Sequence, residues 1–126
     1  MSLYSDKILN HAKHPKRFGR ITNPDLQFEH VNPLCGDRIR VEIRWTEERD
    51  VLEAKFSGEM CAIAKASASI LFESLEGLTP AAIIRISDQQ VLENLGGTTA
   101  RSRVNCALLP VVALRGALQY SYVVCS

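Results

Sequence analysis

In the segment DRIRVEIRW, residues 37–45, polar and hydrophobic residues alternate without a break. Two sets of side chains should face opposite sides of this segment: Ile39, Val41, Ile43 and Trp45 on one, and Arg38, Arg40, Glu42 and Arg44 on the other. A period of two residues is typical of a β-strand with one buried face. We therefore expect a strand here, with its charged side chains on a solvated sheet face.

Two further strands are expected beside this one. The segment VLEAKFSG, residues 51–58, also alternates, and Leu52, Ala54 and Phe56 are predicted to point inward. Only a short polar turn separates it from the preceding strand, which favours an antiparallel hairpin. The segment LQFEHV, residues 26–31, alternates more weakly and is predicted to be another strand.

Helices are expected before and after these strands. The predicted segments are residues 5–14, 61–77, one or two short helices within 79–97 with Thr79 and Ser87 as N-caps, and a final helix over 106–123. Pro110 is compatible with the final helix only in its first turn, because proline has no backbone N–H. Strands followed by helices predict an α+β fold, a small antiparallel sheet of about three strands with helices on one face. A length of 126 residues suits a single domain over residues 1–126.

The composition narrows the classes of function. Hydrophobic residues make up 46% of the chain, charged residues 23%, and the net charge is +1, which gives no reason to expect nucleic acid or an anionic membrane as a partner. The longest apolar run, residues 107–114, is too short to span a bilayer. The N-terminus has no hydrophobic secretion core. We expect a cytoplasmic protein whose thiols are reduced.

Four cysteines, Cys35, Cys61, Cys106 and Cys125, are widely spaced, with no C-x-x-C pair. Cys35 lies in the loop before the central strand, and Cys61 and Cys106 lie at the expected starts of two helices. The partial positive charge of a helix N-terminus stabilises a thiolate. Each cysteine alone is more often a small buried hydrophobic residue. Three of them at element boundaries favour a shared site that the fold assembles.

Asp37 follows Cys35 by two residues and has two interpretations. It is either an ordinary turn residue, or a fourth ligand that Gly36 brings close to Cys35 by permitting a tight backbone path. Three thiolates and one carboxylate can complete a tetrahedral zinc site. The same set can hold a [2Fe–2S] cluster, whose stable form normally takes four thiolates. With a carboxylate as the fourth ligand, such a cluster is expected to be labile.

Three motifs in order resemble the U-type iron–sulfur scaffold family, which comprises IscU, SufU and the N-terminal domain of NifU. They are NPLCGD at residues 32–37, FSGEMC with the following ASAS at 56–69, and RVNCAL at 103–108. The likeness runs from about Tyr4 to Tyr120. It implies the IscU-like α+β fold and a site of Cys35, Asp37, Cys61 and Cys106.

In that family the site receives sulfur from a PLP-dependent cysteine desulfurase. It binds zinc, or it binds iron and builds a transient [2Fe–2S] cluster that passes to recipient apo-proteins. The resemblance implies the same cofactors and partners here, with the chain a monomer or a weak homo-oligomer.

Departures from the family pattern point to a compact, SufU-like member. Asn105 stands where the IscU branch has a histidine, and residues 99–103 replace its Leu-Pro-Pro-Val-Lys chaperone-recognition segment. The 45 residues from Cys61 to Cys106 leave little room for the insertion typical of SufU. Cys125 matches no motif and is expected to be a free thiol in the C-terminal tail.

These residues are compatible with three functions and disfavour a fourth. The first is a non-enzymatic scaffold for iron–sulfur cluster assembly, and the second is a zinc-dependent sulfur acceptor that activates a desulfurase. The third is a small structural zinc domain, which should unfold when its metal is removed. A cysteine hydrolase is disfavoured, because His11, His14 and His30 all precede Cys35 and nothing local pairs one of them with a thiol.

Overall fold

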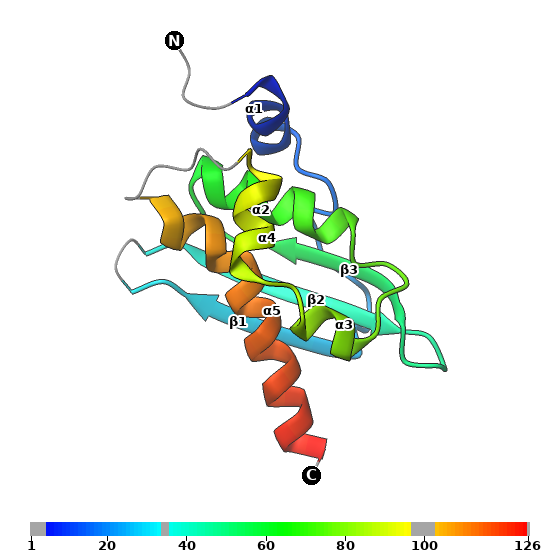
Figure 1. Ribbon diagram of the computed structural model, residues 1–126. Helices are drawn as coiled ribbons and strands as arrows, with labels where there is room; N and C mark the ends of the chain where they lie inside the picture. The colour runs from blue at the N-terminus through cyan, green and yellow to red at the C-terminus, as the bar shows by residue number, and fades with distance from the viewer. Residues whose placement is uncertain (1–4, 34–35, 97–102, 126) are drawn as a thin grey trace.

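The fold is an antiparallel sheet of three strands with helices packed against it, as predicted (Figure 1). The structure, a computed structural model, describes residues 5–33, 36–96 and 103–125. The strands are β1 (Leu26–Val31), β2 (Arg38–Trp45) and β3 (Val51–Ser57), in the order β1-β2-β3. The helices are α1 (Asp6–Lys13), α2 (Ala62–Glu73), α3 (Pro80–Ile84), α4 (Asp88–Asn94) and α5 (Val104–Cys125).

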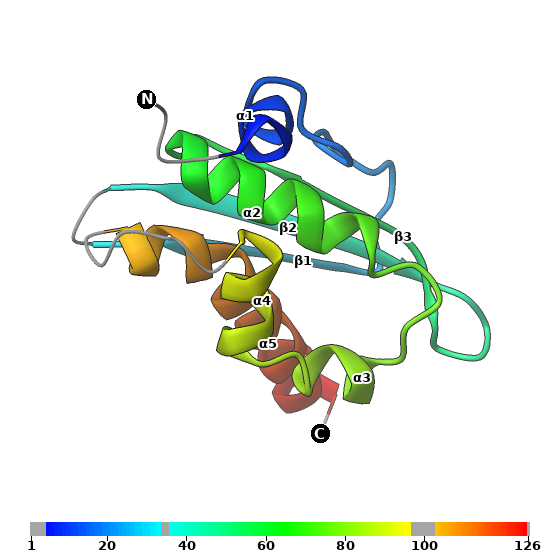
Figure 2. The same cartoon turned by 45° about the horizontal axis from the view of Figure 1, so that its top comes forward.

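The central strand β2 supplies the middle of the hydrophobic core. Ile39, Val41 and Ile43 are fully buried, as their alternation predicted. In the sheet, Val41 lies between Phe28 of β1 and Phe56 of β3. Helices α2 and α5 cover this face of the sheet (Figures 1 and 2). The sheet therefore forms one layer and the helices the other.

The inward position predicted for Leu52 is wrong, since this side chain is 53% exposed. The cause is a shift of register in the β2–β3 pairing. Trp45 pairs with Val51 and Arg44 pairs with Glu53, so Leu52 is an extra residue on β3. A bulge of this kind breaks the period of two. Val51, rather than Leu52, is consequently buried in the core.

The face of β2 away from the helices is not wholly solvated, which corrects a second prediction. Arg38 and Arg44 are exposed, whereas Glu42 is buried with 1% of its surface exposed. The Nε of Arg20 donates to Oε1 of Glu42 at 2.9 Å, and the Nε of Arg40 lies 3.8 Å from the same oxygen. The connector after α1 therefore lies against this face, a long-range contact that strand alternation cannot reveal.

The outer edge of β3 is closed at both of its ends. Near the C-terminal end, Phe56 exchanges two backbone hydrogen bonds with residues 17–19, at 2.8 and 3.0 Å. At the N-terminal end, Val51 exchanges two with residues 77–78, both at 2.9 Å. Two loops thus take positions that further strands would occupy.

The ends of the helices confirm the predicted caps and correct two boundaries. Helix α2 ends at Glu73, four residues before the predicted end at residue 77. Thr79 and Ser87 accept backbone N–H groups at the starts of α3 and α4, at 3.1 and 3.0 Å. The region 79–97 thus holds two short helices. Helix α5 begins at Val104, two residues before the predicted start, so Pro110 lies inside it and beyond the first turn. The restriction of Pro110 to the first turn was therefore wrong.

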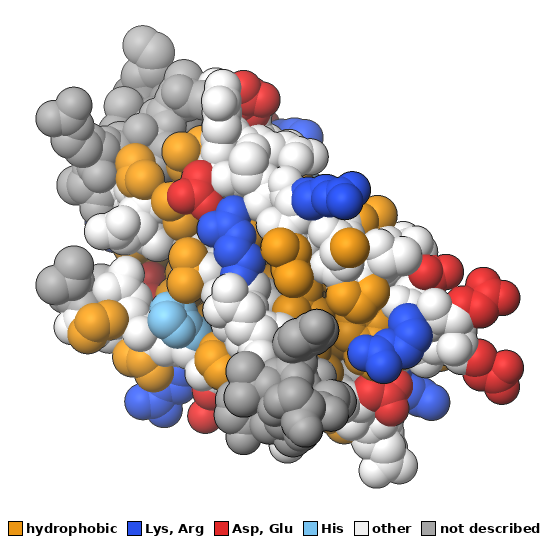
Figure 3. All heavy atoms as spheres, turned by 60° about the horizontal axis from the view of Figure 1, so that its bottom comes forward, with side chains coloured by type: hydrophobic (Ala, Val, Ile, Leu, Met, Phe, Trp, Pro, Cys, Tyr) orange, Lys and Arg blue, Asp and Glu red, His pale blue; other side chains and the backbone are white. Residues whose placement is uncertain are grey.

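The surface mixes charged and hydrophobic side chains, as the face drawn in Figure 3 shows. Large hydrophobic side chains with more than a third of their surface exposed include Val31, Ile84 and Val112. Among the described helices, none combines the length and the apolar character needed to cross a bilayer.

Candidate metal site

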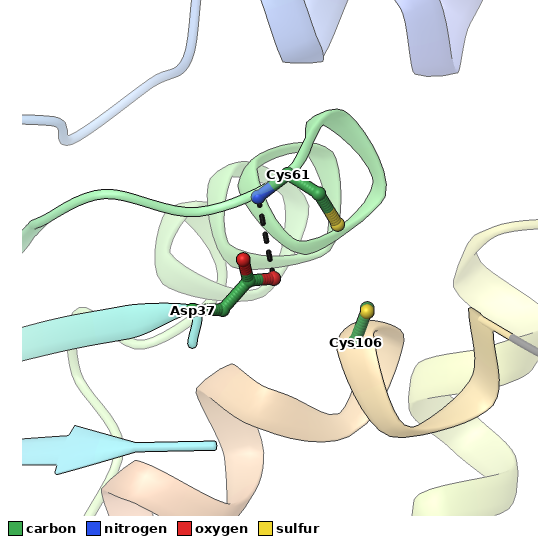
Figure 4. Close-up of side chains that lie close together, drawn as sticks. All are labelled: Asp37, Cys61 and Cys106. Carbon is green, nitrogen blue, oxygen red and sulfur yellow. Dashed lines mark hydrogen bonds between the residues drawn. The ribbon is translucent and has the colours of Figure 1, made fainter. Parts of the chain in front are cut away.

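Three of the four predicted site residues lie together, at the ends of three separate elements. Asp37 directly precedes β2, Cys61 is the N-cap of α2, and Cys106 is the third residue of α5. Their carboxylate oxygen and two sulfur atoms all lie within 4.8 Å of one another. Figure 4 shows the carboxylate and the two thiols directed toward the same space. The fold has thus assembled the group from segments far apart in the sequence.

The three side chains differ in their access to solvent. Cys106 is buried, with 5% of its surface exposed, whereas Asp37 and Cys61 are half-buried. Among the described residues, no disulfide joins Cys61 or Cys106 to another cysteine. The group is therefore most enclosed at Cys106 and most accessible at Asp37 and Cys61.

A hydrogen bond joins Asp37 to the start of α2. The backbone N–H of Cys61 donates to Oδ2 of Asp37 at 3.3 Å (Figure 4). The side chain of Cys61 makes no capping hydrogen bond of its own. The first N–H groups of a helix need outside acceptors, and a negative charge is favourable there. Asp37 provides both, and the contact keeps its carboxylate beside the Cys61 thiol.

Gly58 allows the chain before Cys61 to pass close to the beginning of β2. Its φ is +130°, and a Cβ at this position would lie 2.2 Å from the carbonyl oxygen of Arg38. The N–H of Arg38 donates to the carbonyl of Glu59 at 2.7 Å. This close approach, which only glycine permits, fixes the loop that carries Cys61 against the strand that follows Asp37.

The fourth predicted residue, Cys35, lies outside the described residues, so its membership of the site stays a prediction. The backbone on either side of it forms a tight loop. The N–H of Gly36 donates to the carbonyl of Asn32 at 2.8 Å, and that of Asn32 to the carbonyl of Asp37 at 2.8 Å. Gly36 has a φ of +78°, which agrees with the predicted tight path. The side chain of Cys125 is likewise not described.

Sequence reasoning missed two buried serines of α2. The hydroxyl of Ser67 donates to the carbonyl of Ala107 at 2.6 Å, next to Cys106. The Oγ of Ser69 accepts the N–H of Lys16 at 2.7 Å and lies 2.7 Å from Nδ1 of His11. The available signal was a pair of hydroxyls in an otherwise apolar helix segment, ASAS at residues 66–69.

The donor set fits zinc and iron. Thiolate sulfur and carboxylate oxygen are both ordinary zinc ligands, at about 2.0–2.3 Å from the ion. Thiolates also hold iron in iron–sulfur clusters. Two sulfurs and one oxygen within 4.8 Å of one another need only small side-chain movements to share an ion. Asp37, Cys61 and Cys106 are therefore chemically and spatially suited to hold such a metal.

Comparison with known proteins gives consistent results. The family model for the NifU-like N terminal domain matches residues 3–123. The chain is 33% identical over 116 residues to the iron–sulfur cluster assembly scaffold protein IscU 1 of Archaeoglobus fulgidus, covering 92% of this chain and 74% of that protein. It is 39% identical over 77 residues to the zinc-dependent sulfurtransferase SufU of Bacillus subtilis, covering 60% of this chain and 50% of that one.

The fold agrees with a solved relative. A SufU protein of Fervidobacterium islandicum, described as an iron–sulfur cluster assembly scaffold, superposes with a TM-score of 0.76 at 26% sequence identity. The match covers 92% of this chain and 96% of that one. The family model spans nearly the whole chain, and the sheet and helices match those of a relative. The chain therefore belongs to the NifU-like N-terminal domain family, the family of the IscU, SufU and NifU scaffold proteins.

Proposed function

We propose that the protein is a scaffold on which a [2Fe–2S] cluster is assembled and then handed to recipient apo-proteins. The observation that carries the proposal is the convergence of Asp37, Cys61 and Cys106, whose ligand atoms lie within 4.8 Å of one another. With Cys35, these residues make up the proposed ligand set. The membership of the family supports the same function.

The proposed roles differ between the thiols and the carboxylate. A cysteine thiolate attacks the outer sulfur of a persulfide on a PLP-dependent cysteine desulfurase. A new S–S bond forms, the donor's S–S bond breaks, and the donor keeps its thiolate, so the transfer itself needs no external electrons. Reduction of the transferred sulfur to cluster sulfide then takes two electrons per sulfur from an external reductant. The half-buried Cys61 is more accessible to such a donor than the buried Cys106. Asp37 holds iron more weakly than a thiolate and so leaves the cluster exchangeable.

Anaerobic reconstitution with ferrous iron and sulfide tests this proposal. The wild-type protein should develop the visible charge-transfer absorption of a [2Fe–2S] cluster. An apo-ferredoxin added afterwards should take up the cluster. A reconstituted protein that stays colourless and binds no iron contradicts the scaffold function.

A second candidate is a zinc-dependent sulfur acceptor that stimulates a desulfurase. The similarity to the zinc-dependent sulfurtransferase SufU of Bacillus subtilis, 39% over 77 residues, favours it. In this function zinc occupies the site at rest, and one cysteine leaves the metal to accept sulfur. Desulfurase turnover, measured with the zinc-loaded and the zinc-free protein, separates the two candidates. Strong stimulation by the zinc-loaded form alone supports the sulfur acceptor.

A further inference from the structure

Ser67 makes a contact between α2 and α5 beside the candidate metal site. Only 2% of its surface is exposed. Its hydroxyl donates to the carbonyl of Ala107 at 2.6 Å, and Ala107 directly follows Cys106. The hydrogen bond thus joins the helix that begins after Cys61 to the first turn of the helix that carries Cys106.

A serine at this place is not explained by the formation of α2. Its neighbours Ala66 and Ala68 are fully buried, and alanine is the better helix former. A buried hydroxyl costs free energy unless it is hydrogen-bonded. Serine inside a helix commonly bonds to the carbonyl four residues earlier in the same helix. Here the hydroxyl of Ser67 bonds to a different helix instead.

The first turns of α5 lack one internal hydrogen bond, so a contact from another helix can help to stabilise them. Pro110 lies inside the helix and has no N–H to donate to the carbonyl four residues earlier. This end of α5 therefore forms one fewer internal hydrogen bond than an uninterrupted helix. The hydrogen bond from Ser67 joins this end of α5 to α2. Ser67 lies six residues after Cys61, which corresponds to about 9 Å along the axis of α2.

We propose that Ser67 is a positioning residue for the candidate metal site. By fixing the first turn of α5 against α2, its hydroxyl holds the Cys106 thiol at the distance from Cys61 that a shared metal ion requires. The inference rests on the proposed function only in that the site binds a metal. Partners beyond the ligands themselves commonly change metal affinity 10- to 100-fold.

Ser69 provides the matched control. It lies one half-turn further along α2, is fully buried, and makes its hydrogen bonds to the other side, toward Lys16 and His11. Ser69→Ala removes a buried hydroxyl of the same kind without touching the contact with α5. A purely structural role for Ser67 predicts that the two alanine variants behave alike at the metal site.

Zinc affinity, measured by competition with a chromophoric chelator, is the first test. Ser67→Ala should bind zinc at least about tenfold more weakly than the wild type, and Ser69→Ala within about twofold of it. With Co²⁺ as a spectroscopic probe, Ser67→Ala should lose thiolate-to-cobalt absorption and Ser69→Ala should keep it. Equal affinities and spectra in Ser67→Ala and the wild type overturn the proposal, and so do equal losses in both variants.

Alkylation of the metal-free protein is the second test, with the modified peptides resolved by mass spectrometry. In Ser67→Ala the buried Cys106 should react several-fold faster than in the wild type, while the rate at Cys61 stays unchanged. Unchanged alkylation at Cys106 counts against the positioning role. A wild-type protein that binds neither zinc nor iron refutes the proposed function and, with it, the metal-site role of Ser67. A wild-type protein that binds metal, with unchanged affinity and alkylation in Ser67→Ala, refutes the positioning role alone.

A conservative variant separates the hydrogen bond from packing. Ser67→Thr keeps a hydroxyl donor at the same position, and its folding is checked by circular dichroism together with that of Ser67→Ala. The folded threonine variant should bind zinc within about threefold of the wild type. A tenfold loss in folded Ser67→Thr contradicts a role for the hydrogen bond.

Discussion

Oδ2 of Asp37 accepts the backbone N–H of Cys61 at 3.3 Å, so the residue before β2 caps the helix that follows β3. A carboxylate has two oxygens, and the same side chain can therefore cap the helix and bind a metal. Asp37 therefore contributes both to the stability of α2 and to the ligand set of the candidate metal site. The two contributions can be separated by substitution.

The capping role of Asp37 predicts a loss of stability in the metal-free protein. Asp37→Ala removes the acceptor of the Cys61 N–H and should lower the free energy of unfolding by about 1 kcal/mol. Asp37→Asn keeps an acceptor oxygen and should lose less. Urea denaturation of the metal-free variants measures both values. If Asp37→Ala is as stable as the wild type, the hydrogen bond has no capping role.

The two described thiols should both be needed for tight metal binding. Cys61→Ser and Cys106→Ser each replace a soft thiolate by a hydroxyl, a poor ligand for zinc, and should weaken zinc binding about 100-fold or more. Cys125→Ser is the control and should bind zinc as the wild type does. Competition with a chelator gives the affinities. Wild-type affinity in either of the first two variants would remove that cysteine from the site.

Replacing Gly58 by alanine should lower the free energy of unfolding much more than replacing a glycine that has open space around it. Gly58→Ala places a Cβ 2.2 Å from the carbonyl oxygen of Arg38 and should cost about 3 kcal/mol or more. Gly77→Ala is the control: its φ is +88°, nothing lies within 4 Å of the added Cβ, and the cost should be about 1–2 kcal/mol. Chemical denaturation of both variants tests the difference. Similar costs would contradict the close approach at Gly58.

The ion pair on the far face of the sheet should contribute more than a pair that is accessible to water. A double-mutant cycle with Arg20→Gln and Glu42→Gln should give a coupling of about 1 kcal/mol or more, because the Glu42 carboxylate is buried and accepts a hydrogen bond at 2.9 Å.

The half-buried pair of Lys55 and Glu53, 3.7 Å apart and much more accessible to water than Glu42, is the control and should couple by less than about 0.5 kcal/mol. Urea denaturation gives the unfolding free energies for both cycles. Couplings of equal size would show that the burial of Glu42 adds nothing to its interaction with Arg20.

The parts of the fold that sequence reasoning predicted are those set by local patterns. The alternation around Val41 identified β2, and the polar residues Thr79 and Ser87 marked the starts of α3 and α4. The parts it missed depend on distant contacts. The contact between Arg20 and Glu42 joins residues that are far apart in the sequence. The alternation within β2 therefore could not predict that Glu42 is buried.

The grouping of Asp37, Cys61 and Cys106 was predicted from a different kind of signal. Cysteines at element boundaries are visible in the sequence, and the order of the motifs around Cys61 and Cys106 carried the resemblance to the scaffold family. That their sulfurs and the Asp37 carboxylate lie within 4.8 Å of one another had to come from the tertiary structure. The Ser67 contact was not predictable, since a hydroxyl in a helix does not reveal which carbonyl it meets.

The two closed ends of β3 limit how this sheet can grow. Residues 17–19 and 77–78 occupy the backbone of β3 at Phe56 and Val51, and, within the described part of the chain, no strand pairs with the outer side of β1. Growth of a fibre by strand pairing requires two unpaired sheet edges on every molecule. Because both ends of the β3 edge are already paired, a second folded molecule has only the β1 edge open to it along its full length, and pairing through β1 alone ends at two molecules.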